Sequence, residues 1–391
     1  MRVAINAWFW GQPATGSGQY IRHLLPALAT LTPTARFGPV VPIGAKWQCL
    51  TPNVFPHMTS GPGFLTSDRF GSRLADLYKL WFEQVLFPRA AAGQKAGVAH
   101  VPYFAAPIWP ATPTVVTVHD LIPMVLPAYR GSALVRAYTR LVAAGARRAD
   151  AVIADSEHSK RDIVAHLKID PQRVHVIPLA AGPQFQPATP EEIASVRARH
   201  NLPDRYVLYL GGFDQRKNVP ALLRAFARLQ AGPGLGLVIA GRLPARDTAF
   251  APDPRPIAAQ LGIEDSVVFP GWIDERDKPP LYSGAELFAF PSAYEGFGLP
   301  VLEAMACGAP VVTSTASSLP EVSGDAAVTV DPYEVNGLAQ AMAIVLDDAE
   351  RRRAMGKAGL VQASRFSWQH TAEATLRVCR QALAISSPDF P

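Results

Sequence analysis

Short apolar runs alternate with longer amphipathic segments along this chain of 391 residues. Apolar spacing typical of helices covers Tyr20–Leu31 and Gly71–Leu86. Runs typical of buried strands are predicted at Arg2–Trp8, Thr114–Val118, Ala151–Ala154 and Val174–Pro178. Because strands that alternate with helices usually pair in parallel, the pattern predicts an α/β fold.

The pattern breaks at Leu179–Pro203, which is rich in Pro and Ala and is predicted to be a linker. Beyond it the alternation restarts, with helices predicted over Val219–Leu229 and Leu299–Ala306. The predicted strands are Tyr206–Leu210, Leu235–Ala240, Ser266–Phe269, Ala285–Phe290 and Pro310–Thr313. We therefore predict two Rossmann-like, doubly wound domains that face a central cleft between the carboxyl ends of their sheets.

The composition agrees with two globular domains. Hydrophobic residues make up 49% of the chain and charged residues 18%, which is enough apolar surface for two cores. Cys49, Cys307 and Cys379 lie far apart and form no disulfide or zinc pattern, which favours a reducing cytoplasm. The start of the chain does not resemble a signal peptide. Four prolines interrupt the uncharged run 96–118, so no transmembrane segment is predicted.

The charge is distributed unevenly. The net charge of +5 divides into +9 for residues 1–182 and −4 for residues 183–391. The basic half contains the segment RGSALVRAYTRLVAAGARR, whose arginines are Arg130, Arg136, Arg140, Arg147 and Arg148. Two interpretations stay open: peripheral contact with the anionic inner face of a membrane, or an ordinary solvated helix. We predict no nucleic-acid partner.

Two acids lie eight positions apart in residues 294–308, which read YEGFGLPVLEAMACG. Charge in such an apolar and glycine-rich segment costs free energy unless something uses it. The predicted strand before the segment and the predicted helix inside it place Glu295 on a loop above the sheet. Glu303 is then expected in the first turn of the helix, close to Glu295 in space.

This segment has the features of a sugar-nucleotide site. The start of a helix offers free N–H groups to a phosphate, and Gly296 and Gly298 allow the backbone to approach a ligand closely. Carboxylates beside the phosphate would accept hydrogen bonds from sugar hydroxyls. The alternative is structural: Glu303 would complement the helix dipole and Glu295 would be a solvated turn acid.

The segment resembles the E-x₇-E signature of retaining glycosyltransferases of family 4, which have the two-domain GT-B fold. Other stretches that resemble this family are TGSGQYIRHLL, LWFEQVLFP, TVVTVHDLIP, SSLPEVSGDAAVTVDP and FSWQHTAEATLRVCRQAL. The resemblance implies an acceptor-binding domain, 1–182, completed by a carboxyl-terminal helix over 370–391. It also implies a donor-binding domain over 183–369. The similarity is weakest over 36–70 and 243–260.

The resemblance implies roles for residues of the second domain. Glu295 would bind hydroxyls of the transferred sugar, and Glu303 would bind the nucleotide ribose. The backbone of the loop and helix start would lie near the sugar or the diphosphate, at Gly296, Phe297, Gly298 and Leu299.

A basic pair, Arg216 and Lys217, is expected near the same donor. Lys217 matches the basic residue that binds the donor diphosphate in the family, where a fixed cation stabilises the leaving group. Many relatives have an Arg where this chain has Gly212, so either Arg216 or another basic residue compensates, or the donor binds more weakly. The alternative for the pair is an exposed helix start.

In the first domain, Gly16 and Gly18 precede a predicted helix. The dinucleotide pattern G-x-G-x-x-G is not met, because Ile21 occupies its last position. Two interpretations of the glycines remain: their backbone binds a diphosphate, or they form a plain tight turn. His119 ends a predicted strand and by resemblance contacts the transferred sugar, with Asp120 orienting it. A histidine at a strand end is otherwise usually structural.

The resemblance implies sugar transfer from a nucleoside diphosphate sugar to a hydroxyl of a glycan or a lipid-linked acceptor. The chain has no D-x-D motif, so neither a metal nor a cofactor is expected. GDP-mannose is the leading donor because LYLGGFDQRKN and LPEVSGDAA resemble bacterial polysaccharide mannosyltransferases; UDP-linked glucose or N-acetylglucosamine stays open. Two alternatives also stay open: a UDP-sugar 2-epimerase of the same fold, and a non-catalytic partner subunit.

Overall fold

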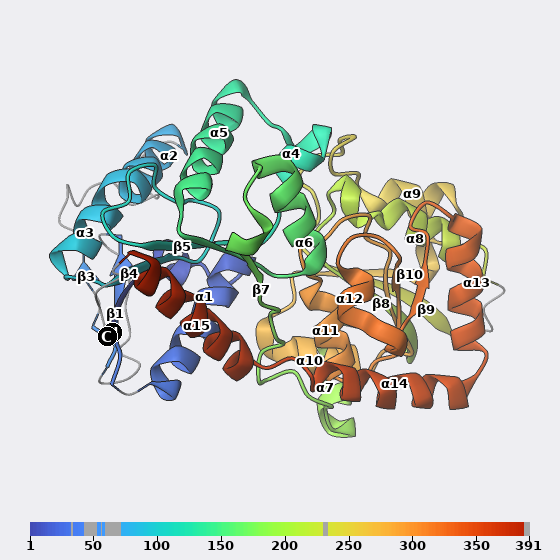
Figure 1. The fold of residues 1–391 in the computed structure, drawn as a ribbon. Helices are drawn as coiled ribbons and strands as arrows, with labels where there is room; N and C mark the ends of the chain where they lie inside the picture. Colours follow the sequence, from blue (N-terminus) through green and yellow to red (C-terminus); the bar gives the residue numbers. More distant parts are fainter. Residues whose placement is uncertain (33, 43–52, 56, 59–71, 230–233, 387–391) are drawn as a thin grey trace. The chain divides into compact units, whose positions relative to one another are not determined.

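The computed structural model of the chain describes residues 1–32, 34–42, 53–55, 57–58, 72–229 and 234–386. It divides into two compact units, shown in Figure 1. The first unit is Met1–Leu179 with Trp368–Pro391, and the second is Ala180–Ser367. The first domain was predicted to end at residue 182 and to resume at residue 370. In the structure it ends at Leu179 and resumes at Trp368, slightly earlier in both places.

The first unit has a sheet of seven parallel strands in its described part, in the order β3-β2-β1-β4-β5-β6-β7. Its strands are β1 Arg2–Asn6, β2 Arg36–Val41, β3 His57–Met58, β4 Val98–Val101, β5 Thr114–Val118, β6 Ala151–Ala154 and β7 Val174–Val176. Strand order reverses between β1 and β4, so this is a doubly wound sheet, and ligands of such sheets bind outside the carboxyl ends at the reversal.

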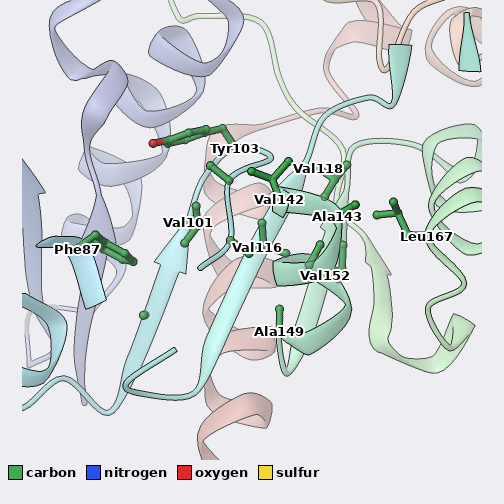
Figure 2. Close-up of a cluster of buried hydrophobic side chains, with 14 of the residues drawn as sticks. Phe87, Val101, Tyr103, Val116, Val118, Val142, Ala143, Ala149, Val152 and Leu167 are labelled. Atoms are coloured by element: carbon green, nitrogen blue, oxygen red, sulfur yellow. The ribbon is translucent and has the colours of Figure 1, made fainter. Parts of the chain in front are cut away.

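Helices cover both faces of this sheet (Figure 1). They are α1 Gly16–Leu31, α2 Ser72–Trp81, α3 Phe87–Gly93, α4 Ile122–Val125, α5 Ala133–Arg148, α6 Glu157–Asp162 and α15 Trp368–Ser386. On one face, α3 and α5 bury a core against β4, β5 and β6 (Figure 2). Its members include Phe87, Val101, Val116, Val142 and Val152, all at most 1% exposed. On the other face α1 packs alongside α15.

The second unit has six parallel strands among the described residues, in the order β10-β9-β8-β11-β12-β13. They are β8 Arg205–Leu210, β9 Leu235–Ala240, β10 Val267–Gly271, β11 Leu287–Phe290, β12 Val311–Ser314 and β13 Val328–Val330. The helices are α7 Pro190–Arg199, α8 Val219–Phe226, α9 Pro254–Gln260, α10 Lys278–Ser283, α11 Leu299–Ala306, α12 Leu319–Ser323, α13 Val335–Leu346 and α14 Ala349–Ala363. Here the strand order reverses between β8 and β11.

Several predicted elements have other ends in the structure, and three of the differences have a visible cause. The strand predicted over Arg2–Trp8 ends at Asn6, because the Asn6 side chain accepts the Trp8 N–H at 3.1 Å and a 3₁₀ helix follows. The helix predicted over Gly71–Leu86 starts at Ser72, Gly71 lying outside the described residues, and continues through a π-helical turn into α3. The predicted linker contains α7, whose first turn is closed by a capping box between Thr189 and Glu192.

Two predictions from composition can be compared with the structure. The uncharged run 96–118 forms β4 and β5. No helix of the described residues is both long and apolar enough to cross a membrane. Cys307 and Cys379 are buried free thiols, and Cys49 lies outside the described residues.

Candidate active site

The polar cluster of the second unit lies where its strand order reverses. A 3₁₀ turn, Gln215–Lys217, follows β8, and the loop that carries Glu295 follows β11. Because β8 and β11 are neighbouring parallel strands, these two loops emerge at the same edge of the sheet. The Ala293 N–H donates to the Arg216 carbonyl at 2.7 Å, which joins the two loops directly.

Glu295 binds both predicted cations through one oxygen. Its Oε1 accepts hydrogen bonds from Lys217 Nζ at 2.6 Å and Ser292 Oγ at 2.6 Å, and pairs with Arg216 Nη1 at 2.9 Å. Burial alone would raise the pKa of this carboxyl, but Lys217, Arg216 and Ser292 outweigh it and hold the pKa below its ordinary value. Glu295 is therefore a carboxylate. No hydrogen bond to its Oε2 is found among the described residues.

The cations are fixed by several contacts each. Burial lowers the pKa of Lys217, although Glu295 opposes the effect, and its ammonium group lies 4.9 Å from the centre of the Phe290 ring. Arg216 also pairs with Asp214 at 3.1 Å and donates to the Tyr294 carbonyl at 2.9 Å. Arg216 and Lys217 are thus parts of the site and not the exposed helix start of the alternative interpretation.

Ser318 and Gly298 determine the shape of the loop before α11. Ser318 Oγ lies within hydrogen-bond distance of the carbonyls of Glu295, 2.9 Å, and Phe297, 2.7 Å. Gly298 has a φ of +113°, and a Cβ there would lie 2.7 Å from a Leu319 methyl carbon. This conformation begins α11 without a side-chain cap. Within the described part of the chain, no partner is found for the N–H groups of Gly298 and Leu299.

Phe297 and Gly296 complete this loop. The Phe297 ring packs edge-on against Phe366 with centroids 5.8 Å apart, and the residue is only 5% exposed. Its side chain is therefore a packing group. Gly296 also takes part in an interaction.

Glu303 is a buried residue of α11 itself. It is 5% exposed and accepts a hydrogen bond from the Tyr282 hydroxyl at 3.0 Å. Burial raises its pKa to about 7, although Lys278 and Tyr282 act in the opposite direction. Glu303 is the fifth residue of α11, so the prediction that it lies in the first turn is wrong. No hydrogen bond or ion pair joins it to Glu295 in the described residues.

Gly212 has room for a side chain. A Cβ at this position would meet only Asp214 Oδ2, at an ordinary contact distance of 3.4 Å. The usual Arg of the family is therefore absent without a steric reason. Arg216 is already bound to Glu295, Asp214 and the Tyr294 carbonyl, as described above.

His119 follows β5 in the first unit, and Asp155 orients it. Its Nδ1 lies 2.7 Å from Asp155 Oδ2, and its Nε2 lies 3.1 Å from the Pro102 carbonyl. The hydrogen bond of Nδ1 thus goes to Asp155, whereas Asp120 Oδ1 accepts the Ile122 N–H at 3.0 Å at the start of α4, and the orienting role of Asp120 stays a prediction. Sequence analysis missed Asp155, although it directly follows a predicted strand, and the carboxyl ends of neighbouring parallel strands meet.

These contacts set the charge of His119. Burial lowers the pKa of the imidazole, but the Asp155 carboxylate, Asp120 and the Pro102 carbonyl together raise it above its ordinary value. Both neighbouring oxygens are hydrogen-bond acceptors, which favours the protonated ring. The His119 carbonyl, in turn, accepts a hydrogen bond from Ser159 Oγ at 3.1 Å.

Gly16 and Gly18 were predicted to precede the helix, but they lie in the first turn of α1, and their surroundings differ. A Cβ on Gly18 would lie 2.0 Å from the Gln12 carbonyl oxygen, and the Gly18 N–H is used by the Thr15 side chain, which caps α1. Gly18 therefore allows the close approach of the Gln12 carbonyl, and its N–H is already used by the helix cap. A Cβ on Gly16 would meet nothing within 4 Å, so the backbone there borders open space.

No cluster of three His, Cys, Asp or Glu residues that could hold a metal occurs in the described ranges. The metal independence of the site remains a prediction.

Solved structures of similar fold cover nearly the whole chain. Sucrose-phosphate synthase from Thermosynechococcus elongatus superimposes with a TM-score of 0.76 over 98% of this chain and 100% of that one, at 23% identity. The Anabaena protein HepE, solved in complex with UDP-glucose, gives a TM-score of 0.67 at 19% identity, over 99% of this chain and 100% of that one. These neighbours share the GT-B fold predicted above.

Family models and relatives assign the family. The model described as glycosyl transferases group 1 matches residues 191–361, and that of glycosyltransferase family 4 matches residues 59–181. O-antigen chain mannosyltransferase B of Escherichia coli is 31% identical over 67% of this chain and 68% of its own length.

Other relatives are covered only in part. The serotype-specific mannosyltransferase WbdA of Escherichia coli is 33% identical over 66% of this chain, which spans 32% of that protein. The D-inositol 3-phosphate glycosyltransferase of Segniliparus rotundus is 32% identical over 62% of this chain and 55% of its own length. From the two family models and the first of these relatives, we conclude that the chain belongs to the family 4 glycosyltransferases of the GT-B fold.

Proposed function

We propose that this glycosyltransferase transfers mannose from GDP-mannose to a hydroxyl of a glycan or lipid-linked acceptor in polysaccharide synthesis, with retention and without a metal. Two Escherichia coli relatives named as mannosyltransferases support the sugar. A neighbour solved with UDP-glucose supports a nucleotide-sugar donor, and it keeps UDP-linked sugars as the competing donors.

One observation carries the proposal: the two oxygens of Glu295 have different surroundings. Oε1 is bound by Lys217, Arg216 and Ser292, whereas Oε2 has no hydrogen-bond partner among the described residues. A carboxylate fixed in this way can accept a sugar hydroxyl on Oε2 without leaving its cations. Lys217 and Arg216 then place two positive charges beside the diphosphate in this proposal.

The proposed chemistry uses positions and charges that these residues hold before the donor binds. The bond between the anomeric carbon and the diphosphate oxygen breaks, and the diphosphate leaves with the bonding electrons. The acceptor hydroxyl attacks from the same face, and its proton passes to the departing phosphate oxygen. Lys217, Arg216 and the free N–H groups at the start of α11 stabilise the negative charge that develops there.

Glu303 and His119 have secondary roles in this proposal. Glu303 accepts hydrogen bonds from the ribose hydroxyls, which requires its ionised form. The role that the resemblance gives His119 toward the transferred sugar would require one ring N–H to leave its present acceptor, and Nε2, 3.1 Å from the Pro102 carbonyl, has the longer of the two contacts. Asp155 is a positioning residue for His119.

Thermal unfolding with GDP, UDP, ADP and TDP tests the donor class before any acceptor is known. We expect GDP to raise the melting temperature most, with no change when EDTA is added. A larger shift with UDP would contradict the proposed donor. A shift that disappears with EDTA and returns with magnesium would contradict metal independence.

A further inference from the structure

The chain returns from the second unit to the first through a short segment that carries two aromatic residues. The second unit ends at Ser367, and α15 begins with Trp368. Phe366 precedes this boundary, and both aromatic side chains are half-buried. We call residues 366–368 the crossover segment.

In the second unit, Phe366 packs on the loop before α11. Its ring meets the Phe297 ring edge-on, with centroids 5.8 Å apart and planes 77° apart. Phe297 lies between Glu295 and Gly298, which belong to the proposed donor site. The helix α14, which ends at Ala363, packs against α11 and so fixes Phe366 beside this loop. A shift of the loop therefore acts directly on the Phe366 ring.

In the first unit, Trp368 packs on residues of α1, the helix beside α15 (Figure 1). It stacks on His23, with centroids 5.1 Å apart and planes 20° apart, and its centroid lies 6.0 Å from that of Tyr20. Tyr20 is 1% exposed, and its ring meets the His119 ring edge-on at 4.9 Å. A single aromatic ring therefore separates Trp368 from His119.

The surroundings of Trp368 are fixed, whereas its own indole has an unused donor. Thr371 Oγ1 in the first turn of α15 donates to the Pro178 carbonyl at 2.7 Å, and the Tyr20 hydroxyl lies 3.3 Å from Thr117 Oγ1. Trp368 Nε1 is buried without a hydrogen-bond partner among the described residues. Such an N–H costs free energy, which a rotation of the indole toward an acceptor or water would recover. Trp368 is therefore a side chain with a reason to change position.

We propose that Phe366 and Trp368 are positioning residues that couple the loop before α11 to His119. Nucleotide binding shifts Phe297, and the ring of Phe366 follows it. Trp368, two residues further along the chain, then changes its packing on Tyr20 and thereby the position of His119. Coupling of this kind is carried by packed side chains that touch in sequence. The inference rests on the proposed function, because it places the nucleotide at the loop before α11.

Fluorine NMR of the whole chain, labelled with fluorinated tryptophan, tests the coupling. Trp368→Phe and Trp109→Phe assign the two signals that matter. Saturation with GDP should shift the Trp368 signal. The signal of Trp109, which is 74% exposed in the same unit, should stay unchanged. A parallel titration with UDP keeps the test independent of which base the donor carries.

Variants of Phe366 show whether the shift passes through its ring. Phe366→Leu and Phe366→Met remove the ring and fill much of its volume, so they should abolish the shift of the Trp368 signal and leave nucleotide affinity in calorimetry near that of the wild type. Phe366→Tyr keeps the ring and should keep the shift. A nucleotide that touched Trp368 directly would shift its signal in all of these variants.

Turnover gives a second readout. In Phe366→Leu, kcat with the donor should fall by up to about a hundredfold, the effect of a misplacement of about 1 Å in an active site, with little change in KM. Trp368→Leu should lower kcat in the same way. The double variant should be no slower than the slower single variant, because both changes interrupt one path.

The outcomes separate this inference from the proposed function. If the wild type binds neither nucleotide, both are wrong. If it binds only UDP, the proposed donor is wrong and UDP tests the coupling. A nucleotide that binds without moving the Trp368 signal, or moves it equally in Phe366→Leu, would overturn the coupling and leave the proposed function standing. Losses of kcat that multiply in the double variant would also overturn it.

Discussion

Glu303 should couple nucleotide binding to pH. Burial raises its pKa from the ordinary 4.5 to about 7, so near neutral pH a large fraction of the free protein carries a protonated acid at this position. Ribose hydroxyls bind the ionised form better, because a carboxylate can accept several hydrogen bonds. Binding of GDP should therefore release a proton from Glu303.

The size of the effect follows from the pKa. At pH 6 about a tenth of the carboxyl groups are ionised, and at pH 8 about nine tenths, so GDP affinity should rise about tenfold between these values. The same pKa shift also links folding to pH, with the opposite sign. The raised pKa gives its full stability below pH 4.5, and this contribution, about 3 kcal/mol at most, is lost as the pH rises through 7.

Calorimetry at pH 6, 7 and 8, in buffers of different ionisation enthalpy, measures both the affinity and the protons released. Glu303→Gln is the matched control, because it keeps the shape of the side chain and cannot ionise. Any pH dependence that it retains belongs to the phosphates of GDP or to other groups. The reasoning is refuted if the wild type and Glu303→Gln show the same pH dependence, or if the wild type releases no more protons than the variant.

Three further predictions concern other parts of the chain. Glu295→Ala should bind GDP at least as well as the wild type, because Lys217 and Arg216 lose the carboxylate that competes with the diphosphate for them, and its kcat should fall by at least about tenfold. Equal loss of GDP binding in Glu295→Ala and Glu303→Ala would contradict the separate roles of the two acids. Gly212→Arg restores the arginine that many relatives have, at a position where the structure has room for a side chain. It should raise the affinity for GDP by about tenfold in calorimetry. Weaker binding of GDP would show that the arginine does not fit there. Flotation should recover more protein with anionic vesicles than with neutral ones, and the double variant Arg136→Glu, Arg140→Glu on α5 should abolish this difference. Equal, negligible binding to both vesicle types would mean that α5 is an ordinary solvated helix.

Buried parallel strands made the fold readable from the sequence. Strands covered by helices on both faces are continuous apolar runs, and β6 and β9 were predicted with the limits that the structure gives them. The predicted linker does begin where the chain passes to the second unit, but it was wrong over Pro190–Arg199, because Pro and Ala suggested an irregular segment there. Thr189, Pro190 and Glu192 already form the start signal of a helix there, with a cap, a first-turn proline and a capping-box acid.

Contacts between distant residues were harder to predict. The motif containing Glu295 and the turn containing Lys217 were both identified, but their ion pair joins positions 78 residues apart and depends on β8 and β11 being neighbours. The partner of His119 was assigned to the adjacent Asp120, whereas Asp155 reaches it from the next strand, 36 residues away. Strand order decides both contacts, and no local pattern encodes strand order.

The central claim is transfer of mannose from GDP-mannose with retention of configuration. The most direct measurement follows GDP-mannose by proton NMR during the first minutes of reaction, with water or short mannose oligosaccharides as acceptors and EDTA present. The account predicts release of GDP together with mannose or a mannoside whose new anomeric centre is α, and loss of this signal in Glu295→Ala. A β product, a 2-epimerised sugar formed from donor alone, or turnover confined to UDP-linked sugars would contradict it.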